Sequence, residues 1–482
     1  MRLGVLAERL ASVHGSAPMV TEPDGGMTLT FSQASEVVNR WAGGVAARIA
    51  PGDRVVLAVP NGYALLLLCL AVSRAGGIPV PVNSRMRGDE VTHVVTDSGA
   101  SLVVRDAAEL DGSPPLLTAA AGDVGDVAAI FYTSGTTGKP KGAELTHRGL
   151  IGSMGAAVLY PRALRHDEAV LGLPVAHIMG FIVLLGMAAA GIPVYLLAKF
   201  DASRVLDAIA ERRASLFVGV PAMYRMMLEA GAEERDLRLV RVWGSGADVM
   251  PRELAKRFQK MGAMVTLPGG ISMGEAMFFE GYGLVESGGG ALVKVSTPGP
   301  DLFGDAMGIP VPGYRVRVAN EDGTEVAAGA VGELWIKGPG VLTGYHDNPE
   351  ATADTVTGDG WLRTGDLARR GPLGSVAFAG RKKDVVKVGG YSVFAAEVEA
   401  VLQEHPDVLE AAVVGLPDAT LGEVPAAAVR VREGCTTTGA DLEAWAKDAL
   451  APYKCPRRIV ILDELPRTGT QKVQKLELLQ YF

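Results

Sequence analysis

The stretch from Tyr132 to Gly142 reads YTSGTTGKPKG and follows an apolar run, Val127 to Phe131, that is typical of a buried strand. Glycine permits positive φ and keeps side chains out of a ligand's path, so successive backbone N–H groups can face one concavity and hold anionic oxygens. The hydroxyl side chains add donors, and lysine adds a compact positive charge. We interpret the stretch as a phosphate-binding loop. On composition alone, a plain surface loop stays open as the alternative.

The spacing of this stretch excludes the two commonest nucleotide motifs. It does not fit the pattern G-x-x-x-x-G-K-[ST] of Walker-type NTPases, and no G-x-G-x-x-G follows a strand here. If the stretch binds phosphate, it therefore belongs to another class of nucleotide-binding protein.

Composition indicates a folded protein of several domains. The chain has 482 residues, a length that suggests about two to four domains. Hydrophobic residues make up 48% and charged residues 21%, so disorder is disfavoured. The formal charge of -8 argues against nucleic acid and anionic membranes as partners.

Three widely separated cysteines, Cys69, Cys435 and Cys455, exclude a disulfide scaffold or a zinc cluster and suit a reducing compartment. No signal peptide is evident, because Glu8 and Arg9 interrupt the N-terminal apolar pattern. We therefore expect a cytoplasmic location.

One segment, Phe181 to Ala198, is uncharged and nearly as long as a membrane span. Gly191-Ile192-Pro193 interrupts it. We predict a buried helix followed by a buried strand at Val194–Leu197, and no transmembrane segment.

Strands and helices alternate from Thr30 to Met261, which is typical of parallel sheets covered by helices. Thr30 and Gln33 form a capping-box pattern, and Pro79 and Pro81 predict either an edge strand or an irregular segment. A strand is predicted at Leu239–Trp243, followed by a glycine-rich turn at Gly244–Ala247. From about Gly308 the pattern changes to short alternating strands, a small antiparallel unit. A compact α+β unit of about 100 residues follows Gly380.

Five separated motifs stand out along nearly the whole chain, at Tyr132–Gly142, Pro174–Gly180, Tyr282–Glu286, Trp361–Asp366 with Gly380–Tyr391, and Pro466–Lys475. In sequence and in order they resemble the motifs of the adenylate-forming superfamily: acyl-CoA synthetases, adenylation domains of nonribosomal peptide synthetases, and firefly luciferase.

The resemblance implies an α/β fold with a large N-terminal domain of layered αβ sheets plus a small β unit, and a small mobile α+β C-terminal lid. The implied boundaries are 1–379 for the N-terminal adenylation core, 380–384 for the hinge and 385–482 for the lid. A monomer or a homodimer is expected.

The implied activity is that of an AMP-forming acyl-CoA synthetase, an acid–thiol ligase. A carboxylate attacks the α-phosphate of ATP, which gives an acyl-adenylate and pyrophosphate, and the thiol of CoA then displaces AMP. The implied partners are a small carboxylic acid, ATP and CoA, with Mg²⁺ as the metal. Adenylation supplies the good leaving group that a free carboxylate lacks, so the protein mainly positions reactants and offsets phosphate charge.

The resemblance also implies roles for individual residues. The β- and γ-phosphates would be held by Thr133, Ser134, Gly135, Thr136, Thr137, Gly138 and Lys141. Tyr282 would stack on adenine. The residues that surround adenine and the acyl group would be Gly244, Ser245, Gly246, Ala247, Gly281, Tyr282 and Gly283. Glu286 would hold Mg²⁺, a hard cation that prefers oxygen ligands.

The remaining implied roles concern the ribose, the acyl group and the thiol. Asp366 would accept both ribose hydroxyls, and Arg381 would reach the ribose or the α-phosphate. Lys472 would contact the carboxylate and α-phosphate in the first step, and Lys383 would be the pivot of lid rotation. His177 would lie between the acyl pocket and the CoA path. Three residues would face the path of the thiol in the second step, namely Gly389, Gly390 and Tyr391.

Two positions depart from the family pattern. Val285 replaces a threonine, which removes one hydroxyl worth about 1 kcal/mol in a hydrogen bond, and Gln471 replaces the glycine before Lys472. Two alternatives stay open: an acyl-AMP ligase that loads a carrier protein, and a catalytically inactive nucleotide- or acyl-binding protein. Luciferase-like oxidation has no support beyond shared ancestry.

The three glycines Gly288–Gly290 and the apolar stretch around Met273, Met277 and Phe278 suggest a roomy apolar pocket. We expect a fatty or cyclic/aromatic acid rather than acetate or a dicarboxylate.

Overall fold

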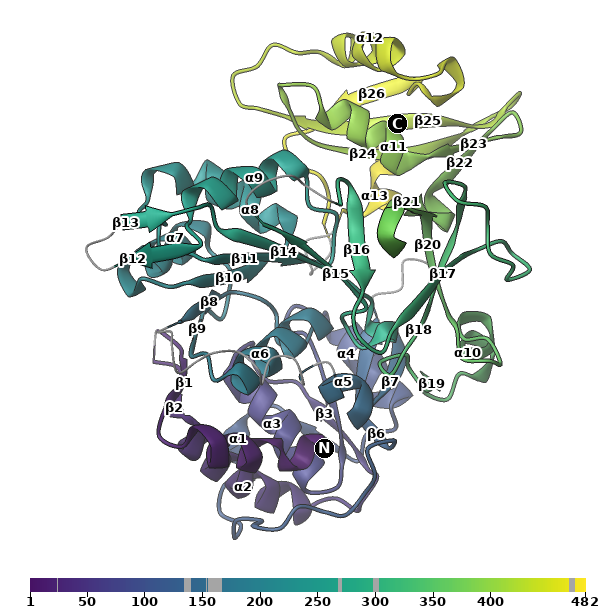
Figure 1. Ribbon diagram of the computed structural model, residues 1–482. Coiled ribbons are helices and arrows are strands. Elements are labelled where there is room, and N and C mark those ends of the chain that lie inside the picture. The colour runs from purple at the N-terminus through teal and green to yellow at the C-terminus, as the bar shows by residue number, and fades with distance from the viewer. Residues whose placement is uncertain are drawn as a thin grey trace. The chain divides into compact units, whose positions relative to one another are not determined.

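A computed structural model describes residues 1–23, 25–133, 140–152, 154, 167–267, 271–297, 303–467 and 473–482. The chain divides into two compact units: unit 1 comprises Met1–Val316 and Ile336–Leu362, and unit 2 comprises Arg317–Trp335 and Arg363–Phe482. Figure 1 labels most of the helices and strands of both. This division does not test the predicted hinge at 380–384, which stays a prediction.

The main sheet of unit 1 combines a parallel centre with antiparallel margins. In spatial order its strands are β16 (Ala306–Pro310), β15 (Leu292–Ser296), β14 (Met277–Tyr282), β11 (Val242–Gly246), β10 (Leu216–Gly219), β8 (Ala169–Leu171), β9 (Val194–Leu196), β1 (Pro18–Thr21) and β2 (Thr28–Thr30). The pairings from β9 through β14 are parallel, whereas β15 and β16 are antiparallel. The predicted α/β fold class is thus confirmed.

Three helices cover one face of the parallel strands (Figure 1): α7 (Ala202–Arg212), α8 (Pro221–Glu229) and α9 (Arg252–Met261). Their apolar sides meet the sheet in one core cluster, in which Tyr224 of α8 and Phe258 of α9 pack against Trp243 of β11. This rigid core carries the strand ends at which the predicted site residues lie. A separate small hairpin consists of β12 (Val265–Leu267) and β13 (Ile271–Met273).

A second, parallel sheet lies in the N-terminal part of unit 1. Its strand order is β4 (Ile78–Pro81), β3 (Arg54–Leu57), β5 (Leu102–Val104), and the helices of this region are α1 (Leu6–His14), α2 (Phe31–Ala46), α3 (Tyr63–Arg74) and α4 (Gly88–Asp97). The strand with Pro79 and Pro81 is at the edge, as predicted, because proline cannot donate to a neighbour. The capping box of Thr30 and Gln33 is confirmed as well.

An antiparallel sheet of β6 (Val127–Thr133), β7 (Lys141–Thr146) and β19 (Gly344–Tyr345) carries the two ends of the predicted phosphate-binding loop. Strand β7 leads directly into α5 (His147–Gly152), where Thr146 Oγ1 accepts from Gly149 N–H at 3.0 Å. Strand β19 leads into α10 (Pro349–Thr355), which Asn348 caps.

The apolar segment predicted as a helix and a strand forms α6 (Ile178–Ala190) and β9. The helix ends at Gly191, whose φ of 68° is a left-handed conformation that glycine adopts without strain. Among the described residues, no helix has both the length and the apolar character that a membrane crossing requires.

The predicted turn at Gly244–Ala247 is wrong in part, because Gly244 to Gly246 continue strand β11. The predicted strand at Leu239–Trp243 accordingly lies three residues too early. Glycine disfavours strands by propensity, but here partners on both sides hold it extended: Gly244 pairs with Val218 and with Phe279. Tyr224 Oη also donates to the Gly244 carbonyl at 2.7 Å.

Unit 2 contains two sheets. One has the order β17 (Arg315–Ala319), β18 (Val331–Lys337), β20 (Leu362–Arg370), β21 (Val376–Arg381), and β17, β18 and β20 each have one end in unit 1. The other has the order β23 (Tyr391–Phe394), β22 (Val385–Val388), β25 (Gly422–Val431), β24 (Val408–Asp418), with β26 (Arg458–Ile461) also paired to β25. The helices are α11 (Ala395–Gln403), α12 (Gly439–Ala449) and α13 (Lys475–Leu478). Valine and alanine side chains of β24 and β25 pack with α11 and α12 in one core, as the predicted α+β unit requires.

Candidate functional site

The two ends of the predicted phosphate-binding loop lie side by side. Thr133 ends β6, Lys141 begins β7, and the two residues pair across the ladder, with Thr133 Oγ1 donating to the Lys141 carbonyl at 3.4 Å. The predicted ligands Ser134, Gly135, Thr136, Thr137 and Gly138 lie outside the described residues. For this motif the structure therefore fixes only where the chain enters and leaves.

Glu286, the predicted Mg²⁺ ligand, lies on a short 3-10 turn, η6 (Val285–Ser287). Its Oε1 accepts a hydrogen bond from the hydroxyl of Tyr345 at 2.8 Å. Burial, followed by the charge of Glu286, raises the pKa of Tyr345, so the phenol stays protonated and remains a donor. Lys141 Nζ lies 5.4 Å from the centre of the same tyrosine ring, a cation–π contact. Tyr345 thus brings two predicted site residues together.

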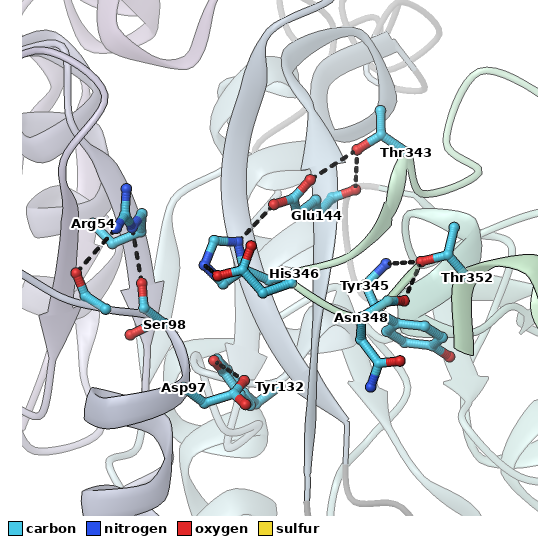
Figure 2. A network of polar contacts seen from close by, with 12 residues as sticks. Arg54, Asp97, Ser98, Tyr132, Glu144, Thr343, Tyr345, His346, Asn348 and Thr352 are labelled. Atoms are coloured by element: carbon cyan, nitrogen blue, oxygen red, sulfur yellow. Dashed lines mark hydrogen bonds and ion pairs between the residues drawn. The ribbon is translucent and has the colours of Figure 1, made fainter. Parts of the chain in front are cut away.

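A polar network holds the strand that carries Tyr345 (Figure 2). His346 Nδ1 lies 2.8 Å from Glu144 Oε1, and Thr343 Oγ1 donates to Glu144 Oε2 at 3.4 Å. The Tyr345 backbone N–H donates to Thr352 Oγ1 at 2.9 Å. Because β19 also pairs with β7, Tyr345 is fixed relative to the end of the predicted loop.

Sequence reasoning missed Tyr345, His346 and Glu144. The separation along the chain, 59 residues between Tyr345 and Glu286, leaves no local pattern that could link them. The one available signal is the glycine–tyrosine–histidine run at 344–346. It lies outside every periodic apolar segment, as functional residues on connecting segments often do.

The residues present fit a magnesium ion if a nucleotide contributes ligands. Among the described residues no cluster of three or more His, Cys, Asp or Glu side chains could hold a metal alone. Mg²⁺ is commonly bound by one or two carboxylates together with substrate phosphates, and Glu286 supplies such a carboxylate. Its Oε1 is oriented by Tyr345, in the way that ligating carboxylates are usually supported by a second hydrogen bond.

The predicted adenine- and acyl-binding residues come together at the ends of two parallel strands. Gly246 of β11 pairs with Gly281 of β14, and Ser245 pairs with Glu280. A Cβ on Gly283 would lie 1.8 Å from the Gly289 carbonyl oxygen, so this position requires glycine for close backbone approach. Ala247 has a φ of 68°, uncommon for a residue with a side chain and a feature that concentrates at functional sites. The stacking role of Tyr282, which ends β14, stays a prediction.

His177 begins helix α6 as its N-cap, where Nδ1 accepts from the Met179 N–H at 3.3 Å. Met179 Cε would lie 3.4 Å from a Cβ on Gly246, so the start of α6 contacts the glycine-rich strand end. The helix-capping contact is structural in itself. The predicted role of His177 beside the acyl group is compatible with this place and stays a prediction.

In unit 2, Asp366 and Arg381 form a close pair. They are register partners on β20 and β21, and Arg381 Nε lies 2.9 Å from Asp366 Oδ1. The Asp366 side chain is only 1% exposed, whereas Arg381 is 37% exposed. Burial, followed by the positive charge of Arg381, lowers the pKa of Lys383, which lies on η8 (Lys382–Asp384). Three predicted site residues are therefore neighbours along one strand end.

The predicted thiol-facing glycines form the two-residue turn between β22 and β23. Gly389 and Gly390 have φ of 54° and 88°, and Val388 pairs with Tyr391 across the turn. Both central residues at positive φ define a hairpin turn that favours glycine. Tyr391 is 60% exposed and stacks on Tyr453 with ring centres 4.7 Å apart. The turn thus presents an exposed aromatic face.

Lys472 lies outside the described residues, but the chain on both sides of it is anchored. Arg467 forms an ion pair with Glu410 and a β-bridge with Val473. Lys475 Nζ lies 2.7 Å from Glu399 and 3.3 Å from Asp384, and these carboxylates raise its pKa against the opposing effect of burial. The two ends of the segment that carries Lys472 are held close together by these contacts.

Comparison with known proteins gives a consistent result. The family model of the AMP-binding enzyme matches residues 7–346, and that of the AMP-binding enzyme C-terminal domain matches residues 397–472. A feruloyl-CoA synthase from Amycolatopsis sp is 35% identical over 485 residues, covering 95% of this chain and 95% of that protein. A 2-succinylbenzoate–CoA ligase from Geobacillus kaustophilus is 32% identical and covers 94% and 93% of the two chains. The crystal structure of ATP-bound MatB from Rhodopseudomonas palustris superimposes with a TM-score of 0.87 at 28% identity, covering 100% of this chain and 99% of that one.

Proposed function

Because the chain belongs to the AMP-binding enzymes, the adenylate-forming family of acyl-CoA ligases, we propose that it is an ATP-dependent acyl-CoA synthetase for a fatty or cyclic/aromatic acid. The observation that carries the proposal is the contact of Tyr345 with both Glu286 and Lys141. It joins a carboxylate suited to Mg²⁺ with the lysine at the end of the predicted phosphate-binding loop.

The first step joins the acid to AMP. A carboxylate oxygen of the substrate attacks the α-phosphorus of ATP, and the bond to the bridging oxygen breaks, releasing pyrophosphate. Glu286 would hold Mg²⁺, which offsets charge on the phosphate oxygens. Thr133, Lys141 and the loop between them would bind the β- and γ-phosphates. We assign Lys472 to the carboxylate and α-phosphate, and Asp366 with Arg381 to the ribose.

The second step transfers the acyl group. The sulfur of CoA attacks the carbonyl carbon of the acyl-adenylate, and AMP leaves with the electrons of the broken C–O bond. The glycine turn Gly389–Gly390 would let pantetheine approach closely beside Tyr391. We propose that the lid turns about Lys383 between the two steps, which removes Lys472 from the site before the thiol arrives.

We propose that a group of apolar side chains near the end of β11 lines the acyl side of the site. Met179, Val183, Val218 and Ala247 are partly buried and pack around a small core cluster beside the Gly246 strand end. A Cβ on Gly289 would lie 2.5 Å from Ile182 Cδ1, so Gly289 packs closely against α6. An apolar lining favours a fatty or cyclic/aromatic acid over acetate or a dicarboxylate. Acetate would leave the apolar surface uncovered, and a dicarboxylate would place a second, unpaired charge against it.

The sequence-based reason for this preference was wrong for Phe278. Phe278 is fully buried in the core between the sheet and helices α8 and α9, and Met273 is 55% exposed on the hairpin strand β13. The prediction that these two residues line a pocket rests on local apolar composition. Such composition does not distinguish a core side chain from one that lines a pocket.

The test is AMP release with CoA and a panel of hexanoate, decanoate, benzoate, acetate and malonate. We expect turnover with at least one of the first three, and no AMP release without acid. Preferential turnover of acetate or malonate would contradict the proposed acid class, and AMP release that needs no CoA would contradict CoA as the proposed acceptor.

We place the enzyme in the cytoplasm, because Cys69, Cys435 and Cys455 are free thiols.

A further inference from the structure

Helix α4 contacts the chain on both sides of the predicted phosphate-binding loop. His93 and Asp97 lie four residues apart on this helix and therefore on the same face. The Tyr132 hydroxyl donates to Asp97 Oδ2 at 2.7 Å (Figure 2), and His93 Nε2 donates to the Pro140 carbonyl at 2.9 Å. Tyr132 immediately precedes Thr133, and Pro140 immediately precedes Lys141. One helix face thus contacts both the entry and the exit of the loop.

The position of Tyr132 is fixed from three sides. Its ring lies over Gly142, its register partner on β7, where a Cβ would approach Tyr132 Cζ to 3.0 Å. The ring of His93 meets it edge-on, with centres 6.3 Å apart and planes at 85°. Burial, followed by the hydrogen bond to Asp97, raises the pKa of Tyr132, so the hydroxyl keeps its proton. The glycine at 142 is thus required for the close packing of this tyrosine.

Helix α4 is itself anchored to the parallel sheet. Arg54 of β3 donates through Nε to the Ser98 carbonyl at 2.8 Å and through Nη2 to the Gly99 carbonyl at 3.1 Å, which satisfies the C-terminal end of the helix (Figure 2). Val94 is fully buried in a cluster that includes Val56 of β3 and Ile130 of β6. The face of His93 and Asp97 therefore has a fixed position relative to β6.

We propose that His93 and Asp97 are positioning residues that hold both ends of the phosphate-binding loop in place for ATP. The inference rests on the proposed function of that loop. Ordering a loop in advance lowers the entropy cost of binding, so its loss weakens binding without changing the groups that contact the ligand. The Tyr132–Asp97 hydrogen bond is exposed and the His93–Pro140 bond is partly buried, so we expect each to contribute a free energy at the low end of the range for a hydrogen bond.

The test uses three variants: Tyr132→Phe, His93→Ala and the double variant. KM for ATP and KM for the acid are measured by ATP–pyrophosphate exchange, together with kcat. We expect KM for ATP to rise roughly threefold in each single variant and about tenfold in the double variant, with KM for the acid unchanged. Asp97→Asn keeps an acceptor oxygen and should behave like the unsubstituted protein, whereas Asp97→Ala should behave like Tyr132→Phe.

The matched control is Thr96→Ala, which alters an exposed residue of α4 whose hydroxyl donates only within the helix, to the Thr92 carbonyl. A second readout, hydrogen exchange of the peptide spanning residues 130–142, does not depend on activity. It should accelerate in the double variant and not in Thr96→Ala. An unchanged KM for ATP in the double variant would overturn the proposal, as would an equal rise in both KM values. If the unsubstituted protein shows no ATP–pyrophosphate exchange at all, the proposed function fails. Equal rates of hydrogen exchange in the double variant and the unsubstituted protein would separately overturn the positioning role.

Discussion

The hydroxyl of Tyr345 donates a hydrogen bond of 2.8 Å to Glu286, although the two residues are 59 positions apart in the chain. The contact exists because β19 pairs with β7 and because the Leu342 N–H donates to the Glu286 carbonyl at 2.9 Å. Carboxylates that bind metals usually have such a supporting donor, which sets the direction of the remaining lone pairs.

Replacing Tyr345 by phenylalanine should therefore weaken the binding of Mg²⁺ specifically. The ring remains for Lys141, but Glu286 loses its donor. We expect the Mg²⁺ concentration for half-maximal pyrophosphate exchange to rise roughly five- to tenfold. The control is Tyr314→Phe, which removes a buried hydroxyl that donates to the neighbouring Ser287 carbonyl at 2.9 Å. It should lower stability and leave the Mg²⁺ dependence unchanged; equal Mg²⁺ curves for both variants would contradict the assignment.

Glu286→Gln should have a larger effect, because the amide keeps the shape of the side chain and removes its charge. We expect the rate of pyrophosphate exchange to fall roughly 100-fold, and excess Mg²⁺ should not restore it. Thermal unfolding reports whether the variant folds. A folded variant with normal exchange would exclude Glu286 as the metal ligand.

Asp366→Asn tests the predicted ribose contact. The buried carboxylate should accept both ribose hydroxyls, so the variant should raise KM for ATP about tenfold. With 2′,3′-dideoxy-ATP, which lacks those hydroxyls, the substitution should have little further effect. Equal losses with both nucleotides would show that Asp366 acts through its pair with Arg381 and not through the ribose.

The stability of unit 1 should fall below neutral pH because of His147. This side chain is 7% exposed, and Nδ1 accepts from the Leu3 N–H at 3.1 Å. Burial, followed by the positive charge of Arg2, lowers its pKa from 6.5 to about 4. Between these two values the unfolded chain binds a proton that the folded chain does not, so stability decreases as the pH falls. We expect a loss of about 1–2 kcal/mol at pH 5 relative to pH 7.5.

The control for this prediction is His147→Asn, whose carbonyl oxygen can still accept from Leu3. Denaturant unfolding of both proteins at pH 5 and at pH 7.5 measures how much stability each loses as the pH falls. Carboxylates contribute equally to both proteins, so the difference isolates His147. Parallel profiles would contradict the assignment.

Much of the framework is predictable because its signals are local. The capping box of Thr30 and Gln33, the edge strand with Pro79 and Pro81, and the glycine at the end of α6 each depend on neighbours a few residues away. The family resemblance depends on short motifs in a fixed order, and the match to the family models confirms it.

The supporting contacts were not predictable, because they join distant segments. Tyr345 reaches Glu286, and Asp97 reaches Tyr132, only once the strands have paired. The strand at Gly244–Gly246 was missed because tertiary pairing overrides the low strand propensity of glycine. The pocket predicted around Phe278 is wrong for a different reason: local apolar composition does not distinguish a core side chain from one that lines a pocket.

The central claim is that the enzyme activates its acid as an adenylate with the help of Lys472, and the Lys472→Ala variant tests it most directly. Two rates are measured: ATP–pyrophosphate exchange with the preferred acid, and CoA thioester formation from the chemically prepared acyl-adenylate. The matched control is Lys475→Met, which removes a lysine that forms ion pairs with Glu399 and Asp384 and should lower stability without separating the two rates.

We expect exchange in Lys472→Ala to fall roughly 100-fold or more, with thioester formation within about threefold of that of the unsubstituted enzyme. Exchange at the normal rate in Lys472→Ala would contradict the account.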